Sequence, residues 1–303
     1  MKYKFGFYLA DIVKFYMENL MIDFITTFNE KIYSEYAKNL LDTFILKADE
    51  SIRLNIFYEG NFDEIKNKYN FKNDKIRFFE FKSADWDIFY KKFGHLVEAN
   101  GYKLTQKNQK VILDGPNYKW QAVKFSFKVF SIYLASKLQG ISDDIVWIDA
   151  DTICNNSINK DNMKKFLPNE DELMSYLGRD NFPPDFPHSE TGFIGFNLKH
   201  KKFNSFIKTA ISIYTTGEVF ALKHYHDCVV YDTTRAIFEM TGTKFKNLSG
   251  DFISESHPFV KCELGNYFDH LKGERKKIGF SPEHPNAKNN SVSRPDEIEL
   301  NFG

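Results

Sequence analysis

The chain has 303 residues, in which 41 Lys or Arg balance 41 Asp or Glu, so its formal net charge at pH 7 is zero. A neutral chain gives no electrostatic reason to expect duplex nucleic acid or an anionic membrane as the main partner. Its three cysteines, an odd number without a C-x-x-C pair, argue against a disulfide framework or a structural zinc site and favour a cytoplasmic protein.

The two ends of the chain differ in composition from the middle. No apolar run approaches the roughly 18 residues that span a bilayer, so we expect no transmembrane segment. Charges at Asp11, Lys14 and Glu18 make residues 1–20 a poor signal peptide, and we interpret them as an N-terminal extension, with an amphipathic surface helix as the alternative. One domain is expected at 21–280, followed by a Pro/Asn/Ser-rich tail at 281–303.

Strand-like and helix-like segments alternate along this domain. That rhythm indicates an α/β fold with a mostly parallel sheet, in which ligands bind at the carboxyl ends of the strands. The first strand is expected at 21–28, and the first helix at 31–48, where apolar residues recur at helical spacing. Further along, strands are expected at 52–60, 76–81, 145–149, 172–180 and 191–198, and helices at 120–140, closed by Gly140, and at 202–217.

The apolar run at 145–148 ends in two carboxylates, Asp149 and Asp151. Residues i and i+2 of a strand point the same way, so the two side chains can converge if the chain turns there. A divalent cation between them would relieve their repulsion, and oxygen ligands suit Mg²⁺ or Mn²⁺. A solvated turn is the alternative, because D-x-D pairs also arise by chance. The position after an apolar strand adds support for the metal site, and both interpretations stay open at this point.

A second motif stands near the end of the domain. In YFDHLKGERKK, the residues His270, Gly273 and Lys276 match the pattern H-x-x-G-x-x-K. With the earlier D-x-D pair, this order of motifs resembles glycosyltransferases of the GT-A fold, and among them family 8, the relatives of glycogenin and of bacterial lipopolysaccharide galactosyltransferases. The chain is similar to an outlying viral or bacterial branch. The resemblance implies a single Rossmann-like α/β domain with a mixed, mostly parallel sheet.

The resemblance also implies an activity, the metal-dependent transfer of a hexose from a nucleotide-diphosphate sugar to a hydroxyl or amine acceptor. Asp149, Asp151 and His270 would hold Mn²⁺ or Mg²⁺ as a mixed nitrogen and oxygen ligand set. Gly273 would let the backbone approach the diphosphate, and Lys276 would place a charge on it. A UDP-sugar is the default donor, and a GDP-sugar is the alternative. The acceptor stays open among a glycan, a lipid-linked acceptor, a protein and a nucleobase.

The end of the first strand is a candidate nucleotide contact, because GT-A folds bind the base and ribose there. The alternative is an ordinary strand exit in which an Asn caps the next helix. The candidate contacts in the segment ITTFNE are Thr26, Thr27, Phe28 and Asn29.

Two lysines of the expected helix 120–140 are further candidates for donor contact. Lys124 and Lys128 lie one helical turn apart and share a face, whereas Phe125 and Phe127 are expected to be buried elsewhere. In GT-A enzymes the helix before the D-x-D strand often donates a basic residue to the donor. A solvated helix face is the alternative.

Two carboxylates are candidates for catalysis at the acceptor. Glu190 precedes an apolar strand, and Asp227 follows a histidine in KHYHDCVVYD. An inverting enzyme needs a carboxylate base, and a retaining enzyme needs a group that stabilises the positively charged sugar, so the stereochemical outcome stays open. The alternative for either residue is a helix or strand cap. Three histidines, His188, His224 and His226, match no known zinc spacing, and we interpret them as solvated loop residues.

Three other functions remain as alternatives. A sugar nucleotidyltransferase would carry a Gly-rich phosphate loop near the first strand, and TTFNEKIYSE has none. A non-catalytic module that binds nucleotide sugars would not be stabilised by Mn²⁺. A dinucleotide-dependent oxidoreductase is disfavoured, because no G-x-G-x-x-G follows any expected strand.

Overall fold

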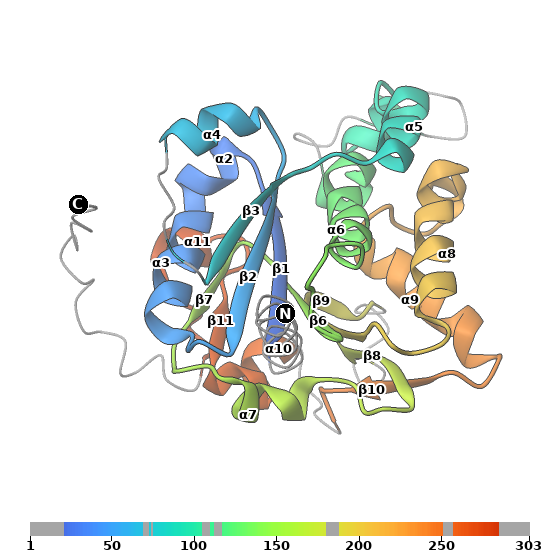
Figure 1. The fold of residues 1–303 in the computed structure, drawn as a ribbon. Coiled ribbons are helices and arrows are strands. Elements are labelled where there is room, and N and C mark those ends of the chain that lie inside the picture. Colours follow the sequence, from blue (N-terminus) through green and yellow to red (C-terminus); the bar gives the residue numbers. More distant parts are fainter. Residues whose placement is uncertain are drawn as a thin grey trace, which may run out of the picture.

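The apolar runs of the sequence form the strands of a mixed sheet, shown in Figure 1. The computed structural model describes residues 21–68, 73, 75–104, 110–111, 117–179, 188–250 and 257–284. The expected extension at 1–20 and most of the expected tail lie outside these ranges, so the domain boundaries stay a prediction. No helix within the described ranges is long and apolar enough to cross a membrane.

Across the described residues, seven strands pair in the order β10-β8-β9-β6-β1-β2-β3. Strands β6, β1, β2 and β3 run parallel, and β10 is parallel to β8, whereas β9 is antiparallel to both of its neighbours. The α/β class with a mixed, mostly parallel sheet is therefore confirmed, as are all six expected strands. The strands are β1 (Ile22–Phe28), β2 (Ile52–Tyr58), β3 (Ile76–Glu80), β6 (Asp144–Ile148), β8 (Glu172–Leu177), β9 (Glu190–Asn197) and β10 (Lys244–Asn247).

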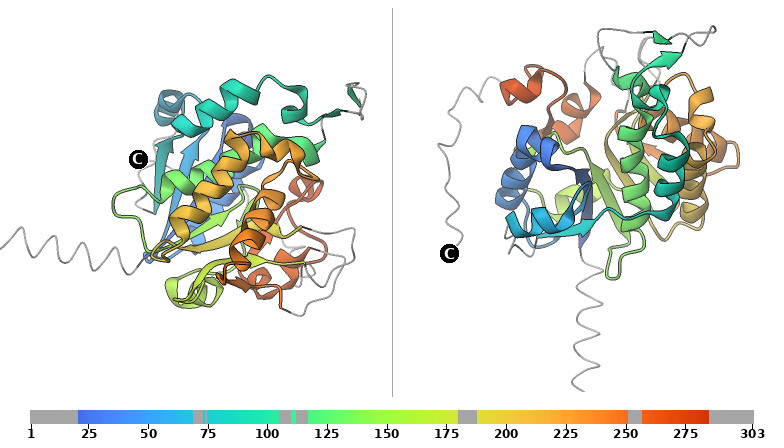
Figure 2. Two further views of the ribbon diagram at one scale, coloured as in Figure 1. Left: turned by 90° about the vertical axis from the view of Figure 1, so that its right-hand side faces the viewer. Right: turned by 90° about the horizontal axis from the view of Figure 1, so that it is seen from above.

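Helices cover both faces of the sheet, and the view from above in Figure 2 shows the sheet between two helical layers. The cause is the two-residue period of the strands: in β1, Phe24 faces one layer and Ile25 the other. Phe24 packs edge-on against Phe44, with ring centroids 5.7 Å apart. Burying each large apolar side chain of this kind contributes about 1.5–3 kcal/mol. The sheet thus lies between two apolar cores, one on each of its faces.

One layer is formed by α2 (Glu30–Ile32), a π-helix (Tyr33–Ala37), α3 (Lys38–Lys47) and α4 (Phe62–Lys68). The other is formed by α5 (Ala84–Phe93), α6 (Ala122–Ala135), α8 (Phe203–Thr215) and α9 (Asp227–Glu239). The three expected helices are present within these layers. Shorter helices are α7 (Lys160–Met163), α10 (Pro258–Lys261) and α11 (Arg275–Ile278), with 3₁₀ turns at Val97–Asn100, Tyr118–Trp120, Lys164–Phe166, Glu218–Ala221 and Glu263–Asn266.

Helix α6 is shorter than the sequence pattern predicts. It ends at Ala135, where bonds of the i to i−3 type at Lys137 and Leu138 tighten the chain into a turn. Gly140 lies beyond that turn with φ +70°, and its carbonyl accepts a hydrogen bond from Arg53 Nη2 at 2.8 Å. The expectation that Gly140 closes the helix was therefore wrong.

A small antiparallel ladder joins two distant parts of the chain. Strand β7 (Thr152–Cys154) pairs with β11 (Phe268–His270), and His270 lies opposite Thr152. Because β7 starts directly after Asp151, this pairing brings the two sequence motifs together. A second short ladder joins β4 (Lys103–Leu104) to β5 (Lys110–Val111).

Candidate active site

Polar side chains converge at one edge of the sheet. Strands β1, β2 and β6 are parallel, so their carboxyl ends place Asn29, Glu59 and Asp149 along that edge. Strand β9 is antiparallel, so it brings its amino end, Glu190, to the same edge, and Asp149 N donates to Gly192 O at 3.0 Å. This is where ligands bind in such sheets.

The two aspartates and the histidine of the sequence motifs meet here. Asp149 and Asp151 occupy a turn that a bond from Thr152 N to Asp149 O closes at 3.1 Å. His270 Nε2 lies 3.0 Å from Asp151 Oδ1 and 3.5 Å from Asp149 Oδ2. One ligand atom from each residue lies within 4.8 Å of the others.

This donor set fits a divalent cation. Two ligands at right angles on Mn²⁺ or Mg²⁺, each about 2.1 Å from the ion, are themselves about 3 Å apart, which is close to the spacing found here. Glu190 Oε1 lies 3.4 Å from His270 Nδ1, behind the ring, so Nε2 faces the carboxylates, as in histidine ligands held by a second carboxylate. Asp149, Asp151 and His270 are thus the residues that could hold the ion.

Gly192 makes room for the imidazole. A Cβ at this position would lie 2.4 Å from His270 Nδ1, which is closer than real contacts allow. Sequence analysis did not single out Gly192, because its importance depends on a ring that arrives from β11.

Electrostatics couple these groups. Burial by itself lowers the pKa of His270, but the charge of Asp151 and its hydrogen bond outweigh burial and raise the pKa to about 9. Burial by itself raises the pKa of Asp151, but His270 and Lys276 hold it well below its usual range. A bound cation would therefore compete with a proton on the imidazole.

Lys128 lines the larger cavity but is almost fully buried beside the aspartates. Its ammonium is 2.8 Å from Asp149 Oδ1 and 2.6 Å from Asp227 Oδ2, and it donates to Thr191 O at 2.8 Å. The residue is only 5% exposed. These anionic partners outweigh the effect of burial and raise its pKa. Lys128 thus holds Asp149 and Asp227 in place, and its expected contact with the donor stays a prediction.

Glu190 and Asp227 line the same pocket, but both are ion-paired. Glu190 is engaged by Lys272 and by Arg179 Nη2, the latter at 3.1 Å. Burial by itself raises the pKa of Glu190, but Lys272 and the imidazoles of His270 and His257 hold it well below the usual range. Asp227, the first residue of α9, accepts from Thr191 Oγ1 at 2.6 Å in addition to Lys128. A role of either carboxylate as a base stays a prediction.

Lys276 and Gly273 stand beside the aspartates, as the motif implies. Lys276 Nζ lies 2.9 Å from Asp151 Oδ2 and 4.0 Å from the centroid of the Tyr36 ring. Gly273 has φ +57°, and nothing lies within 4 Å of the position a Cβ would take. A ligand can therefore approach the backbone at Gly273 while it contacts the ammonium.

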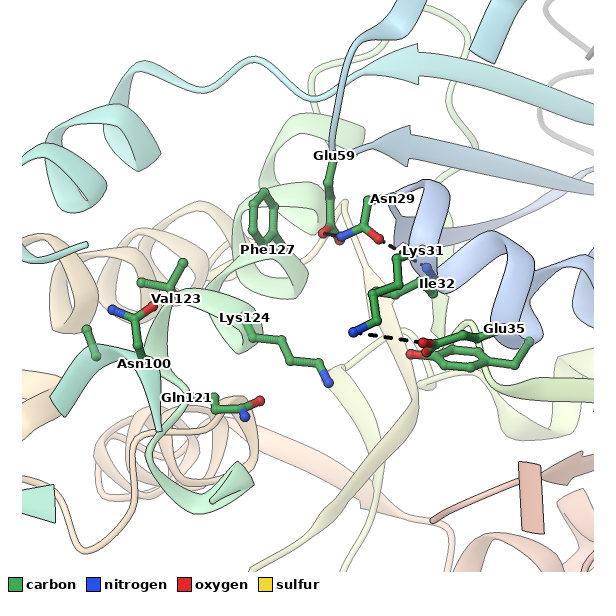
Figure 3. A pocket seen from close by; sticks show the side chains of 12 residues that line it. Asn29, Lys31, Ile32, Glu35, Glu59, Asn100, Gln121, Val123, Lys124 and Phe127 are labelled. Carbon is green, nitrogen blue, oxygen red and sulfur yellow. Dashed lines mark hydrogen bonds and ion pairs between the residues drawn. The ribbon is translucent and has the colours of Figure 1, made fainter. Parts of the chain in front are cut away.

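Two connected cavities open at this edge. The larger, of about 510 Å³, contains the carboxylates, His270, Gly273 and Lys276. The smaller, of about 420 Å³, lies between α6 and the first helical layer, and the side chain of Lys124 extends into it in Figure 3. The two cavities share Ile32, Tyr36, Glu59 and Lys124. Volumes of this size suit a small-molecule ligand with two chemically distinct halves.

The smaller cavity receives only part of the expected nucleotide contacts. Asn29 lines it, although its Oδ1 also caps α2 by accepting from Ile32 N at 3.1 Å. Thr27 lines the larger cavity and its Oγ1 lies 2.9 Å from Glu59 Oε1. Thr26 and Phe28 are fully buried, because alternate residues of β1 face the cores, and neither lines either of these two cavities.

The aromatic side chains next to the lysines of α6 also differ from expectation. Lys124 lines both cavities, and its contact with a donor stays a prediction; burial together with the charge of Lys276 lowers its pKa. Phe125 lines the larger cavity and Phe127 the smaller one, so neither is buried elsewhere. Residues 123, 124 and 127 of α6 line the smaller cavity and residues 124, 125 and 128 line the larger one, so more than one face of the helix contacts the cavities.

Sequence analysis missed Glu59 and Tyr36. Glu59 follows β2 as Asp149 follows β6, so the rule that located Asp149 could have found it. Burial raises the pKa of Glu59 to about 7, despite its hydrogen bond from Thr27. Tyr36 lies in the π-helix, and burial and the charge of Asp151 raise the pKa of its hydroxyl. Helical periodicity could not predict that the ring of Tyr36 contacts the ammonium of Lys276.

No protein-family model matches the chain, and no curated protein is detectably similar to it. Among solved structures, mouse xyloside xylosyltransferase 1 in its apo form gives a TM-score of 0.43 at 14% identity, covering 75% of this chain and 85% of that one. The apo bifunctional glycosyltransferase WbbM gives 0.44 at 11% identity, covering 71% of this chain and 37% of that one. An active-site mutant of LgtC gives 0.42 at 11% identity, covering 69% of each chain. Similarities this distant leave the function to be inferred from the residues of the site.

Proposed function

We propose that the protein is a metal-dependent glycosyltransferase of the GT-A fold, which moves a sugar from a nucleotide-diphosphate sugar to a hydroxyl or amine acceptor. One observation carries the proposal. Asp149, Asp151 and His270 lie within reach of a single cation, and Lys276 and Gly273 stand beside them in the same cavity. Two motifs far apart in the chain thus form one site suited to a diphosphate.

The cation site has a defined chemical role in this proposal. Asp149, Asp151 and His270 would hold Mn²⁺ or Mg²⁺, which when bound neutralises charge on the departing nucleoside diphosphate. Lys276 adds a positive charge at the same place, and the backbone at Gly273 allows a phosphate to come close.

Other residues of the chain keep this machinery in position. Lys128 fixes Asp149 through Oδ1, which leaves Oδ2 toward His270. Glu190 fixes the imidazole from behind. Such supporting partners are worth about 10- to 100-fold in metal affinity. We therefore assign Lys128 and Glu190 to positioning, and Asp227 to holding Lys128.

The smaller cavity suits the nucleoside. The ring of Tyr36 and the side chain of Phe127 offer apolar surface to a base, and Asn29 offers an amide. The Glu59 carboxylate can accept a hydrogen bond from a ring N–H, which a uracil imide provides, and Lys124 lies between the two cavities. A UDP-hexose is the donor we propose, and the H-x-x-G-x-x-K spacing favours family 8. The acceptor class is left open.

The test is release of nucleoside diphosphate from a panel of UDP- and GDP-sugars, with Mn²⁺, Mg²⁺ or a chelator. We expect release from one donor that depends on the metal, and a loss of about 1,000-fold or more in Asp151→Ala, whose fold should be intact because the turn carries other bonds. Asp143→Asn is the matched control, since Asp143 lies beyond the other end of β6 and pairs with Lys199. Full activity of Asp151→Ala, or activity that does not respond to metal, would refute the proposal.

Two further readouts separate the alternative functions. Pyrophosphate release from a nucleoside triphosphate would identify a nucleotidyltransferase instead. A melting temperature that does not rise with UDP and Mn²⁺ together would identify a protein without this site, because a ligand stabilises only the state that binds it.

A further inference from the structure

Three histidines that the sequence pattern assigns to solvated loops form a cluster in the structure. His188 precedes β9, and His224 and His226 lie in the loop before α9. His188 Nε2 is 3.1 Å from His224 Nδ1, and one ring nitrogen from each of the three lies within 4.8 Å of the others. His226 is 6% exposed, and the other two are partly buried. The solvated-loop interpretation was therefore wrong.

The backbone on both sides of the cluster is anchored. Next to His188, Ser189 binds Asp232 of α9 twice, through its N–H at 2.7 Å and its hydroxyl at 2.6 Å. Between the other two histidines, Tyr225 N donates to Lys119 O at 2.7 Å. The three imidazoles are thus held near one another by bonds that do not involve the rings themselves.

Aromatic rings surround the cluster. Trp120 lies 6.3 Å from the ring of His224, and Tyr118 and Phe125 lie 6.0 Å and 5.9 Å from the ring of His226, all between centroids. His226 also lines the larger cavity. The cluster therefore has an apolar surround and one side that faces the cavity.

We propose that His188, His224 and His226 bind a transition-metal ion, Zn²⁺, at a second site that shares no residue with Asp149, Asp151 and His270. Three nitrogens on a tetrahedral Zn²⁺ are about 3.3 Å apart, so small rotations of the rings complete the set. Binding replaces the hydrogen bond between His188 and His224 with two bonds to the metal. Three histidines leave one coordination position, on the cavity side, for an exchangeable ligand.

The donor atoms select the kind of ion. All three proposed ligands are imidazole nitrogens. Ca²⁺ and Mg²⁺ prefer oxygen ligands, whereas Zn²⁺ and Co²⁺ bind the nitrogen of a neutral imidazole well.

The experiment isolates this site from the first one. The full chain carrying Asp149→Asn and Asp151→Asn is titrated with Co²⁺ and followed by its visible absorption, then competed with Zn²⁺. We expect one equivalent of Co²⁺ to bind with the spectrum of a low-coordinate nitrogen site, and Zn²⁺ to displace it. Adding His188→Asn or His224→Asn should weaken Co²⁺ binding by about 100-fold.

His95→Asn, an exposed histidine after α5, is the matched control and should leave binding unchanged. The metal-free melting temperature of each variant shows whether it folds, and two separate histidines are changed so that one misfolded variant does not decide the result. Absence of the Co²⁺ spectrum in the parent, or a spectrum that survives both histidine changes, would overturn the proposal. The aspartate background makes either result independent of the glycosyltransferase proposal.

Discussion

Two buried ionic clusters lie at opposite ends of the parallel strands, and they differ in what their charges face. At the amino end of β1, Asp23 is 0% exposed and accepts from Arg53 Nε at 2.6 Å, from Arg53 Nη2 at 2.8 Å, from Asn55 at 2.8 Å and from Ser142 N at 2.8 Å. At the carboxyl ends, the side chains of Asp149 and Asp151 are 26% and 14% exposed to a cavity.

This comparison separates structure from chemistry. Burial by itself raises the pKa of Asp23, but Arg53 and Asn55 lower it. Both carboxylate oxygens of Asp23 accept hydrogen bonds from protein groups, and the buried side chain lines neither of the two cavities. At the other end, Oδ1 of Asp149 pairs with Lys128, whereas Oδ2 lies toward His270 and the cavity. A buried ionic cluster therefore marks a candidate site only where some of its ligand atoms still face a cavity.

The largest effect on stability is expected in the closed cluster. Asp23→Asn leaves the nearly buried Arg53 without its counterion, and breaking such a pair costs about 3 kcal/mol in free energy of unfolding. Urea denaturation measures the loss, and Asp42→Asn, in the exposed pair with Lys38, should change stability far less. The rate of donor turnover per folded molecule should stay unchanged in Asp23→Asn. A variant that kept its stability and lost turnover would reverse the assignment of the two clusters.

An intermediate effect is expected at Gly192. In Gly192→Ala the new methyl group displaces the ring of His270, and we expect Mn²⁺ affinity to fall by about 10- to 100-fold, measured by calorimetry. Gly195→Ala is the matched control in the same strand, because its methyl group would meet Ser175 Oγ at 2.4 Å instead of a candidate ligand. Equal losses of Mn²⁺ affinity in both variants would mean that a methyl group anywhere in β9 weakens binding by destabilising the strand, and that contact with His270 is not the cause.

The smallest effect concerns the pH dependence of stability through Glu59. Burial raises the folded-state pKa to about 7 from 4.5, so the folded protein binds the proton more tightly than the unfolded chain. The free energy of unfolding should therefore fall as pH rises from 4.5 to 7, and the loss is complete above 7. We expect about 1 kcal/mol, because part of the carboxylate faces the cavity and water screens it. In Glu59→Gln, chemical denaturation at a series of pH values should show this slope removed; an unchanged slope would place its origin elsewhere.

The sequence by itself located six of the seven strands of the main sheet, three of the longer helices and the two motifs of the site, but it did not predict β10, α5 or α9. Short runs of apolar residues located these six strands, because such a run is a local property of the chain. The end of an apolar run located Asp149 and Asp151, and the H-x-x-G-x-x-K spacing located His270. The same reasoning could not tell that the side chain of Phe28 faces a core while the next residue, Asn29, lines a cavity.

Tertiary structure decided how these residues meet. The antiparallel direction of β9 brings Glu190 and Gly192 to the active edge, and the pairing of β11 with β7 brings His270 to Asp151. The burial of Lys128 beneath two carboxylates and the meeting of three histidines have the same origin. The physical reason is that the direction and partner of a strand depend on contacts between residues far apart in the chain, whereas an amino-acid pattern reports only near neighbours.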